Sequence, residues 1–162
     1  MILKSISSIS EEDKKSFSCG NKDLDSFLRI HALRNDQNGY GKTFVLLDKG
    51  ELVGFFTLCS SSIKFEEYPI YQVGLPKYPI PCIKIARLAV RKDKQVKGYG
   101  KELLKQAFLR ILDASTTIGI RLVVVDAKES SASFYEKYGF IRLLSDKLSY
   151  CLPIETIKEA FI

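Results

Sequence analysis

The stretch from residue 83 to residue 115 constrains the fold more than any other part of the chain. Residues 83–90 form a strongly apolar run, and residues 98–115 carry leucine, isoleucine, alanine and phenylalanine at helical spacing. Between the two runs lies the turn Gln95-Val96-Lys97-Gly98-Tyr99-Gly100. The pattern predicts a buried strand, a glycine-containing loop and an amphipathic helix, in that order. Any fold for this chain has to include this unit.

The segments around this unit predict an α/β fold with a mixed sheet. Further strands are expected over residues 2–6, 43–47, 51–60, 120–125, 140–144 and 148–152, and helices over residues 22–36, 131–138 and 154–161. Asn21 is predicted to cap the first helix, and Ser130 or Ser131 the short helix that ends before Gly139. Residues 66–81, which hold four prolines, are expected to form a long surface loop. Because strands and helices alternate, helices should cover both faces of the sheet.

The length and composition limit the class of protein. A chain of 162 residues, 46% hydrophobic and 27% charged, predicts one ordinary globular domain over residues 1–162. We find no apolar segment of membrane-spanning length and no apolar leader after Met1. We therefore expect a cytoplasmic protein without membrane contact.

The cysteines and the single histidine do not form a metal-binding pattern. Cys19, Cys59, Cys82 and Cys151 are widely spaced, without a C-x-x-C pair. We expect buried, reduced thiols and no metal. His31 falls on the apolar side of the predicted helix 22–36, so we expect a core histidine rather than a catalytic one.

Positive charge is concentrated beside the glycine-containing loop. The net charge is +6, and residues 84–105 carry eight basic residues against two acidic ones. The basic residues are Lys84, Arg87, Arg91, Lys92, Lys94, Lys97, Lys101 and Lys105. Such a concentration favours anionic partners, including nucleotide phosphates, RNA or an acidic protein. A solvated surface stripe would have the same composition, so charge alone leaves both interpretations open.

A second glycine-containing stretch, Gly39-Tyr40-Gly41-Lys42-Thr43, ends like a nucleotide-binding P-loop. That motif requires a glycine at position 36, where this chain has Asp36. It also requires a strand before the loop and a helix after it, whereas here a predicted helix precedes and a predicted strand follows. We therefore interpret this stretch as a turn.

The loop between the strand and the helix of the central unit has the context that an anion site needs. A turn that enters a helix presents unpaired backbone N–H groups and the positive end of the helix dipole. Glycines at positions 98 and 100 allow a diphosphate to approach the main chain, and Lys97 and Lys101 add positive charge. We expect phosphate binding here, although a glycine-rich turn before a helix is often only a turn.

Two motifs in this chain resemble those of the GNAT superfamily of N-acetyltransferases. Residues 95–100 fit its [QR]-x-x-G-x-[GA] acetyl-CoA motif, and residues 134–140 its F/L-Y-x-x-x-G-F segment. The resemblance implies a mostly antiparallel sheet, splayed between its fourth and fifth strands, with helices on both faces. It also implies acetyl-CoA as cosubstrate, held by the backbone of Leu88, Ala89 and Val90 and by a pyrophosphate loop. The loop residues are Gln95, Val96, Lys97, Gly98, Tyr99, Gly100 and Lys101.

The same resemblance assigns Tyr135 as the proton donor to the departing CoA thiolate. A phenol with an ordinary pKa of about 10 is protonated at neutral pH and can perform this step. An oxyanion donor is expected among the backbone N–H groups of residues 88–90, and no side-chain base is evident. The alternative role for Tyr135 is a core aromatic beside Phe134 and Tyr138. Lys128 and Ser131 depart from the Asn and Ala common in the family, which puts a substrate contact from that Asn in doubt.

Further segments are similar to one branch of the superfamily, the acetyltransferase toxins of bacterial toxin-antitoxin pairs. These segments are Phe17-Ser18-Cys19-Gly20, Leu24-Asp25-Ser26-Phe27-Leu28, Gly54-Phe55-Phe56-Thr57-Leu58 and Ala86-Arg87-Leu88-Ala89-Val90. The similarity implies acetylation of the α-amino group of aminoacyl-tRNA, and neutralisation by a ribbon-helix-helix antitoxin. Candidate RNA contacts are Lys84, Arg87 and Arg91, and a homodimer is possible in such a system.

Two alternatives remain open at the level of sequence. The acceptor could be a polyamine-like or protein amine, for which Glu51, Glu66, Glu67 and Asp126 would have to form an acidic cleft. The domain could also be catalytically idle and serve as a CoA-binding or RNA-binding module. The intact Tyr135 and the intact glycine loop argue against the idle domain.

Overall fold

The computed structural model describes residues 1–70 and 74–160, and the strands within them form a seven-stranded sheet in the order β1-β2-β3-β4-β5-β7-β6. The strands are β1 (Ile2–Ser5), β2 (Lys42–Asp48), β3 (Glu51–Ile63), β4 (Ile80–Val90), β5 (Leu122–Asp126), β6 (Ile141–Arg142) and β7 (Ser149–Pro153). The β4–β5 pairing is parallel, whereas β1–β2, β2–β3, β5–β7 and β6–β7 pair antiparallel. The predicted mixed, mostly antiparallel sheet is confirmed.

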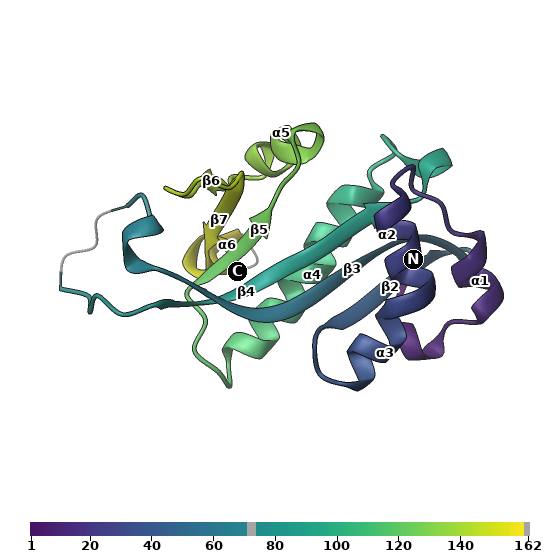
Figure 1. Ribbon diagram of the computed structural model, residues 1–162, viewed down its shortest axis with the longest axis horizontal. Coiled ribbons are helices and arrows are strands. Elements are labelled where there is room, and N and C mark those ends of the chain that lie inside the picture. The colour runs from purple at the N-terminus through teal and green to yellow at the C-terminus, as the bar shows by residue number, and fades with distance from the viewer. Residues whose placement is uncertain (71–73, 161–162) are drawn as a thin grey trace. The chain divides into compact units, whose positions relative to one another are not determined.

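The helices are interspersed with these strands along the chain, and α6 follows the last strand (Figure 1). They are α1 (Glu11–Ser16), α2 (Lys22–Ser26), α3 (Ala32–Gln37), α4 (Tyr99–Ser115), α5 (Glu129–Lys137) and α6 (Ile154–Ala160), with short turns η1 (Ile6–Ser8), η2 (Phe27–His31), η3 (Phe65–Glu67) and η4 (Lys92–Lys94). The sequence did not predict α1, and β6 has two residues where a strand over 140–144 was expected. β4 begins at Ile80, inside the predicted loop 66–81, of which residues 71–73 lie outside the described part.

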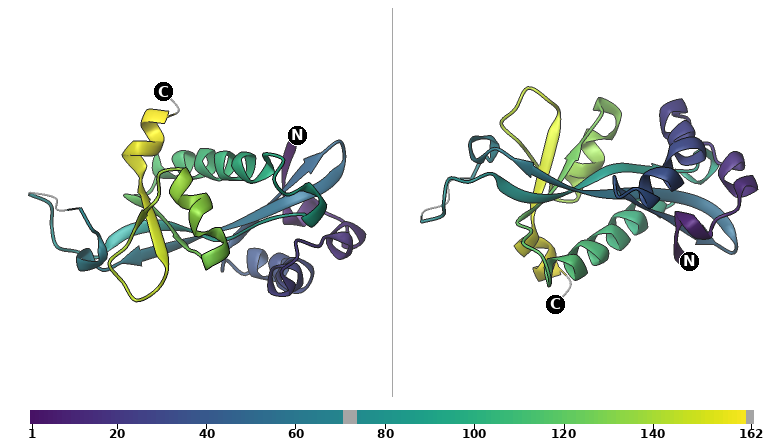
Figure 2. Two further views of the ribbon diagram at one scale, coloured as in Figure 1. Left: turned by 90° about the horizontal axis from the view of Figure 1, so that it is seen from above. Right: turned by 60° about the horizontal axis from the view of Figure 1, so that its bottom comes forward.

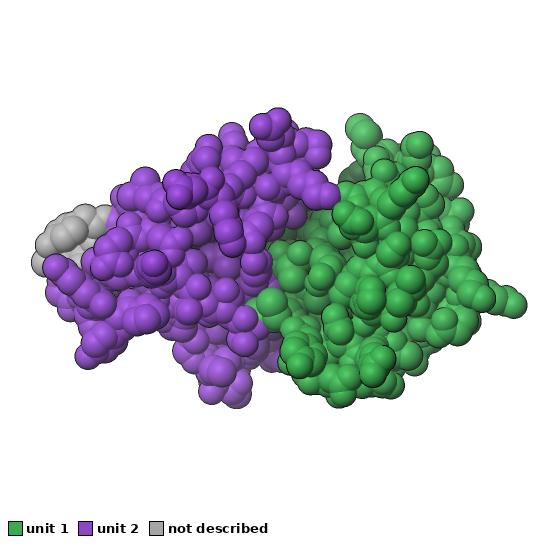
Figure 3. All heavy atoms as spheres, in the orientation of Figure 1, with its two compact units in different colours: residues 1–59, 85–109 green, residues 60–84, 110–162 purple. Residues whose placement is uncertain are grey.

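The chain divides into two compact units, and β3, β4 and α4 contribute residues to both (Figure 3). The first unit holds residues 1–59 and 85–109, and the second holds residues 60–84 and 110–162. The prediction of one domain over residues 1–162 therefore stays a prediction.

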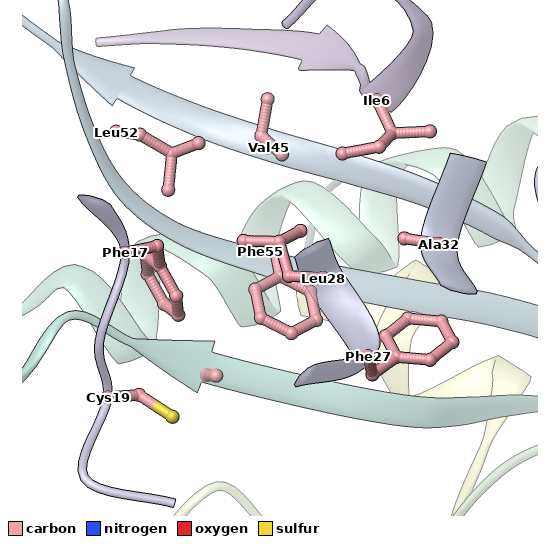
Figure 4. Packing of buried hydrophobic residues seen from close by; sticks show 10 residues of the cluster. Ile6, Phe17, Cys19, Phe27, Leu28, Ala32, Val45, Leu52 and Phe55 are labelled. Carbon is pink, nitrogen blue, oxygen red and sulfur yellow. The ribbon is translucent and has the colours of Figure 1, made fainter. Parts of the chain in front are cut away.

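In the first unit, helices pack against both faces of the strands. Neighbouring residues of a strand point to opposite faces. Phe55 of β3 packs on one face against Phe17 and Phe27, which the helical segments around α1–α3 contribute (Figure 4). On the other face, a Cβ added at Gly54 would lie 2.6 Å from Leu103 of α4. α4 thus covers the face opposite to α1–α3 (Figure 2), and only a glycine permits this approach.

The predicted helix over residues 22–36 is interrupted by a π-helical turn, η2 (Phe27–His31). Ala32 donates its N–H to the carbonyl of Phe27, five residues earlier, so the helix gains one residue in this turn. The extra residue rotates the positions that follow it about the helix axis, relative to an uninterrupted α-helix. Ala32 is buried where the ordinary helical phase would bury His31, and His31 is exposed. The prediction of a core histidine at this position was wrong for that reason.

In the second unit, the β4–β5 ladder is short. It joins Cys82 to Leu122, Ile83 to Val123 and Lys84 to Val124. β5 continues beyond this ladder on its other side, where Asp126 pairs with Ser149 of β7. Parallel pairing of the fourth and fifth strands over three residues, at one end of β4 only, agrees with the splayed sheet that the GNAT resemblance implies.

All four cysteines are free; Cys19, Cys82 and Cys151 are buried as expected, whereas Cys59 is half-buried. Among residues 1–70 and 74–160, no helix is both long and apolar enough to cross a membrane. The same residues include no cluster of three or more His, Cys, Asp or Glu side chains placed to hold a metal ion.

Candidate active site

The turn between β4 and α4 has an unusual backbone. After η4, the backbone φ angle is +63° at Val96 and +88° at Gly98. Left-handed geometry is ordinary for glycine, but a β-branched residue in this region is a genuine outlier. The Val96 side chain is fully exposed, so packing does not impose this conformation. Strained backbone of this kind is concentrated at ligand-binding sites.

Free amides line the same turn. Among the described residues, none accepts a hydrogen bond from the backbone N–H of Val96, Lys97 or Gly98. The N–H groups at the start of α4 have no acceptor within the helix either, because the first turn of any helix leaves them unpaired. Consecutive free N–H groups at a helix N-terminus bind phosphate. The turn therefore fits a diphosphate without rearrangement of its hydrogen bonds.

The basic residues of the stretch 84–105 fall into two groups. Arg91 is neutralised by Glu51, with Nη1 2.6 Å from Oε1, and by Asp93, with Nε 3.0 Å from Oδ1. Lys94 also lies near Glu51. By contrast, the ion pairs formed within the described chain do not include Arg87, Lys92, Lys97, Lys101 or Lys105. Lys97 and Lys101 are exposed beside the free amides, so their charge is available to an anion there.

Gln95 and Tyr99 hold the turn in place. The amide nitrogen of Gln95 donates to two carbonyl oxygens, those of Cys19 and Val90, each at 2.9 Å. The hydroxyl of Tyr99 donates to Asp48 of β2, and this hydrogen bond raises the pKa of Tyr99. Both side chains are engaged with the protein itself. They support the backbone of the turn, and a ligand would meet the amides between them.

At the end of β4, the side chain of Ala89 is buried in the core, while Leu88 and Val90 are half-buried. Because Ala89 points into the core, this residue could contact a ligand only through its main chain. Its carbonyl oxygen would lie 2.8 Å from a Cβ added at Gly54. Residues 88–90 thus lie shortly before the turn, and their role in binding a ligand stays a prediction.

Tyr135 lies on α5 in the second unit, and its side chain is only 6% exposed. Its ring makes edge contacts with Phe134 and Phe140 at centroid distances of 5.2 and 5.4 Å. Burial raises its pKa to about 12. In the part of the chain that the structure describes, the Tyr135 hydroxyl has no hydrogen-bond partner. It is therefore a protonated phenol, held by aromatic contacts and free to donate.

The local sequence around α5 fixes the position of Tyr135. Lys128 is the N-cap residue, and its N–H donates to Ser131 Oγ at 3.1 Å. The prediction that Ser130 or Ser131 is the cap itself was therefore wrong, because Ser131 bonds back from the third helical position. Gly139, with φ at +92°, ends the helix. Tyr150 of β7 donates to Glu136 at 2.6 Å and ties α5 to the sheet, a contact that sequence spacing could not reveal.

Arg87 lies on β4 in the first unit and stacks on an aromatic ring. Its guanidinium carbon is 3.6 Å from the ring centroid of Phe27, the first residue of the π-helical turn. Burial lowers the pKa of Arg87, and no carboxylate within the described chain pairs with it. An arginine keeps its charge in proteins and can bind an anion through the N–H groups of its guanidinium. Arg87 is thus oriented by Phe27, and its charge has no carboxylate partner among the described residues.

Lys84 differs from Arg87, because its charge is used within the second unit. Its Nζ lies 2.6 Å from Asp126 Oδ2, and Ser149 donates to the other carboxylate oxygen at 2.7 Å. Burial alone would raise the pKa of Asp126, but the hydrogen bonds from Lys84 and Ser149 lower it overall. Asp126 is therefore a stable carboxylate and a poor proton acceptor.

The other candidate carboxylates give no evident base. Glu51 is shared between Arg91 and Lys94, and Glu67 accepts the N–H of Lys64 at 3.0 Å. Glu66 is exposed on η3. The expectation that the site has no side-chain base stays a prediction, but three of the four carboxylates proposed for an acidic cleft already have partners.

This chain is similar to known acetyltransferases in both sequence and fold. The profile of a family described as "Acetyltransferase (GNAT) domain" matches residues 39–142. A curated protein of Mycobacterium tuberculosis (strain ATCC 25618 / H37Rv), the "tRNA-acetylating toxin", is 37% identical over 131 residues, which are 80% of this chain and 78% of that protein.

Solved structures are similar over nearly the whole chain. AtaT complexed with acetyl-methionyl-tRNAfMet superimposes with a TM-score of 0.90 and 26% identity, covering 99% of each chain. AtaTR bound with AcCoA gives a TM-score of 0.86 and 27% identity over 99% of this chain and 98% of that one. The AtaT-AtaR complex bound to DNA gives 0.81 and 26% over 100% of both chains.

Proposed function

Because this chain belongs to the GNAT family of acetyltransferases, we propose that it uses acetyl-CoA to acetylate the α-amino group of an aminoacyl-tRNA. The observation that carries the choice of acceptor is the 37% identity to a tRNA-acetylating toxin, together with the match to AtaT in complex with acetyl-methionyl-tRNAfMet. The product would be an N-acetylated aminoacyl-tRNA that cannot accept a peptide at its amino group, so translation would stop. Residues 1–162 would act as one domain.

The first task of the chain is to hold the diphosphate of the cosubstrate. The free N–H groups of Val96, Lys97 and Gly98 and those at the start of α4 supply donors, and Lys97 and Lys101 supply charge. Hydrogen bonds to an ionised acceptor are about twice as strong as neutral ones, so a few suffice for tight binding. The main chain of residues 88–90 would bind the pantetheine arm and orient the thioester.

The second task is proton transfer. Attack of the amine on the thioester carbon forms the C–N bond, and the C–S bond breaks with its electron pair on sulfur. The hydroxyl of Tyr135 supplies a proton to that sulfur, and the proton that the amine nitrogen loses on becoming an amide returns through solvent to restore the phenol. The α-amino group of an aminoacyl ester has a low pKa, so much of it is neutral near pH 7 and needs no strong base. This agrees with the partnered state of Glu51, Glu67 and Asp126.

The relatives also suggest partners. The AtaT-AtaR complex supports an antitoxin for this chain, which we expect to be a ribbon-helix-helix protein, and a cytoplasmic site of action follows from a tRNA substrate. A homodimer would be compatible with such a system. The acetylation of a polyamine is the second candidate, but the ion pairs of Glu51 and Asp126 leave less negative charge for a cationic acceptor.

Incubation with labelled acetyl-CoA tests the proposed function. Total charged tRNA, deacylated tRNA, spermidine and bulk protein are offered separately, and the label is located after alkaline hydrolysis of the RNA. We expect label on amino acids released from charged tRNA and none on deacylated tRNA. Label on spermidine or protein instead would overturn the choice of acceptor and leave the acetyltransferase assignment in place.

Substitution of Arg87 tests its role at the acceptor. Loss of one hydrogen bond to a charged group costs about 1.5–3 kcal/mol, so Arg87→Gln should raise the KM for charged tRNA about tenfold or more. The affinity for acetyl-CoA should stay unchanged. The slope of log KM against log salt should fall by about 1, which corresponds to the loss of one phosphate contact. Arg29→Gln, an exposed arginine on the π-helical turn, is the matched control. If the KM for acetyl-CoA rises instead, Arg87 supports the cofactor.

A further inference from the structure

The segment Ser18–Cys19 lies against the turn that precedes the free amides. The N–H of Lys92 donates to the carbonyl of Ser18 at 2.8 Å, and the side chain of Gln95 donates to the carbonyl of Cys19 at 2.9 Å. These two hydrogen bonds attach both ends of the turn 92–95 to the same two residues. The position of Cys19 thus sets the position of Gln95, and Gln95 directly precedes Val96.

Cys19 is in turn held by Asp25 of α2. Its N–H donates to Asp25 Oδ1 at 2.9 Å, and its thiol donates to the carbonyl of Asn21 at 3.6 Å. Burial, together with the neighbouring carboxylate of Asp25, raises the pKa of Cys19 to about 11, so the thiol stays protonated. Gly20, with φ at +90°, and Asn21, the N-cap of α2, turn the chain back so that α2 meets Cys19.

Asp25 is an unusual residue for such a position, because its side chain is only 8% exposed and it has no cationic partner. None of the ion pairs formed within residues 1–70 and 74–160 includes it. A buried carboxylate without a counter-ion is costly, and only strong hydrogen bonds offset the cost. Among the residues that the structure describes, the one backbone donor that it meets is the N–H of Cys19. The carboxylate of Asp25 therefore fixes the backbone of Cys19.

We infer that Asp25 is a positioning residue for the diphosphate turn, acting through Cys19 and Gln95. The inference rests on the use of acetyl-CoA in the proposed function. The relay runs from Asp25 Oδ1 to Cys19 N–H, then from Cys19 O to Gln95 Nε2, and from the same nitrogen to Val90 O at the end of β4. The relay holds the turn in a conformation that leaves the N–H groups of the strained residue Val96 and its neighbours free. Asp25 itself does not reach the cosubstrate.

Calorimetric titration with CoA tests the relay without any acceptor. Asp25→Ala should weaken CoA binding about tenfold, the loss of one charge-assisted hydrogen bond in the relay. Asp25→Asn can still accept the Cys19 N–H and should bind within about threefold of the wild type. Asp23→Ala removes an exposed carboxylate two residues earlier on the same helix and is the control. In steady-state assays, the KM for acetyl-CoA should rise, and the KM for the acceptor should not.

A double-mutant cycle separates positioning from general destabilisation. Gln95 is exposed, so Gln95→Ala should fold and weaken CoA binding to a similar degree, and the double variant should be little worse than either single one. If the losses of CoA affinity in the two single variants multiply in the double variant, the relay is overturned. Wild-type CoA affinity in Gln95→Ala, or in a folded Asp25→Ala, would overturn it as well. A fall in melting temperature with unchanged CoA affinity would also overturn it. Failure of wild-type protein to acetylate tRNA would affect the proposed function alone.

Discussion

Tyr135→Phe should lower kcat for acetyl transfer by about 10²- to 10⁴-fold, the range that a positioned general acid contributes. The variant removes one oxygen and keeps the ring, whose edge contacts with Phe134 and Phe140 hold the side chain. Because the hydroxyl has no partner among the described residues, its removal leaves no other protein group unsatisfied. Stability and CoA affinity should therefore remain close to those of the wild type.

Single-turnover and steady-state assays, together with CoA calorimetry, measure this prediction. Tyr138→Phe is the matched control, since Tyr138 follows on the same segment and its ring contacts Phe134. The control should keep wild-type kcat. If Tyr135→Phe were as active as Tyr138→Phe, Tyr135 would be the core aromatic of the alternative interpretation. If it lost CoA affinity instead of kcat, the hydroxyl would bind the cosubstrate rather than donate a proton.

The pH dependence gives an independent check on the same residue. Burial raises the pKa of Tyr135 to about 12, and the acid form is the one that works. The donor therefore stays protonated throughout the range in which the protein can be assayed. We expect kcat/KM to rise with pH as the acceptor amine is deprotonated and then to level off, without a falling limb between about pH 8 and 10.

Local periodicity was sufficient to predict most of the fold. The apolar run at 83–90, the helical spacing at 98–115 and the glycine between them identified β4, the turn and α4, because each signal lies within one element. The π-helical turn at Phe27–His31 has no such signal. A single inserted residue shifts the phase of the helix, and only the packing of Phe27, Leu28 and Ala32 in the core reveals it.

The residues of the candidate site also fall into those that a local sequence pattern predicts and those that only the tertiary structure reveals. Tyr135 and Gly98 could be predicted because each stands in a motif with a fixed spacing. Asp25 and Tyr150 act through partners that are distant in sequence or lie on another element, and Asp25 acts on the turn 70 residues further on only through Cys19. Within residues 1–70 and 74–160, Arg87 has no carboxylate partner whereas Arg91 is neutralised, and this difference is likewise a tertiary property. Charge counting along residues 84–105 could not distinguish the two.

Gly98→Val should weaken CoA binding by about 10- to 100-fold, the loss of one or two hydrogen bonds from backbone N–H to a charged phosphate. Gly98 has φ at +88°, which a β-branched residue adopts only with strain. The turn already contains one strained residue, Val96. A second one would drive the backbone to negative φ and turn the amides of residues 98 and 99 away from the diphosphate.

Gly39→Val is the control for backbone strain, because Gly39 has φ at +78° and, like Gly98, no atom within 4 Å of an added Cβ. Both variants should lose a similar free energy of unfolding, about 1–2 kcal/mol, which thermal melts measure. Only Gly98→Val should lose affinity for CoA. Equal CoA affinities in the two variants would mean that the turn after β4 does not hold the diphosphate. The free N–H groups of Val96, Lys97 and Gly98 would then need another ligand.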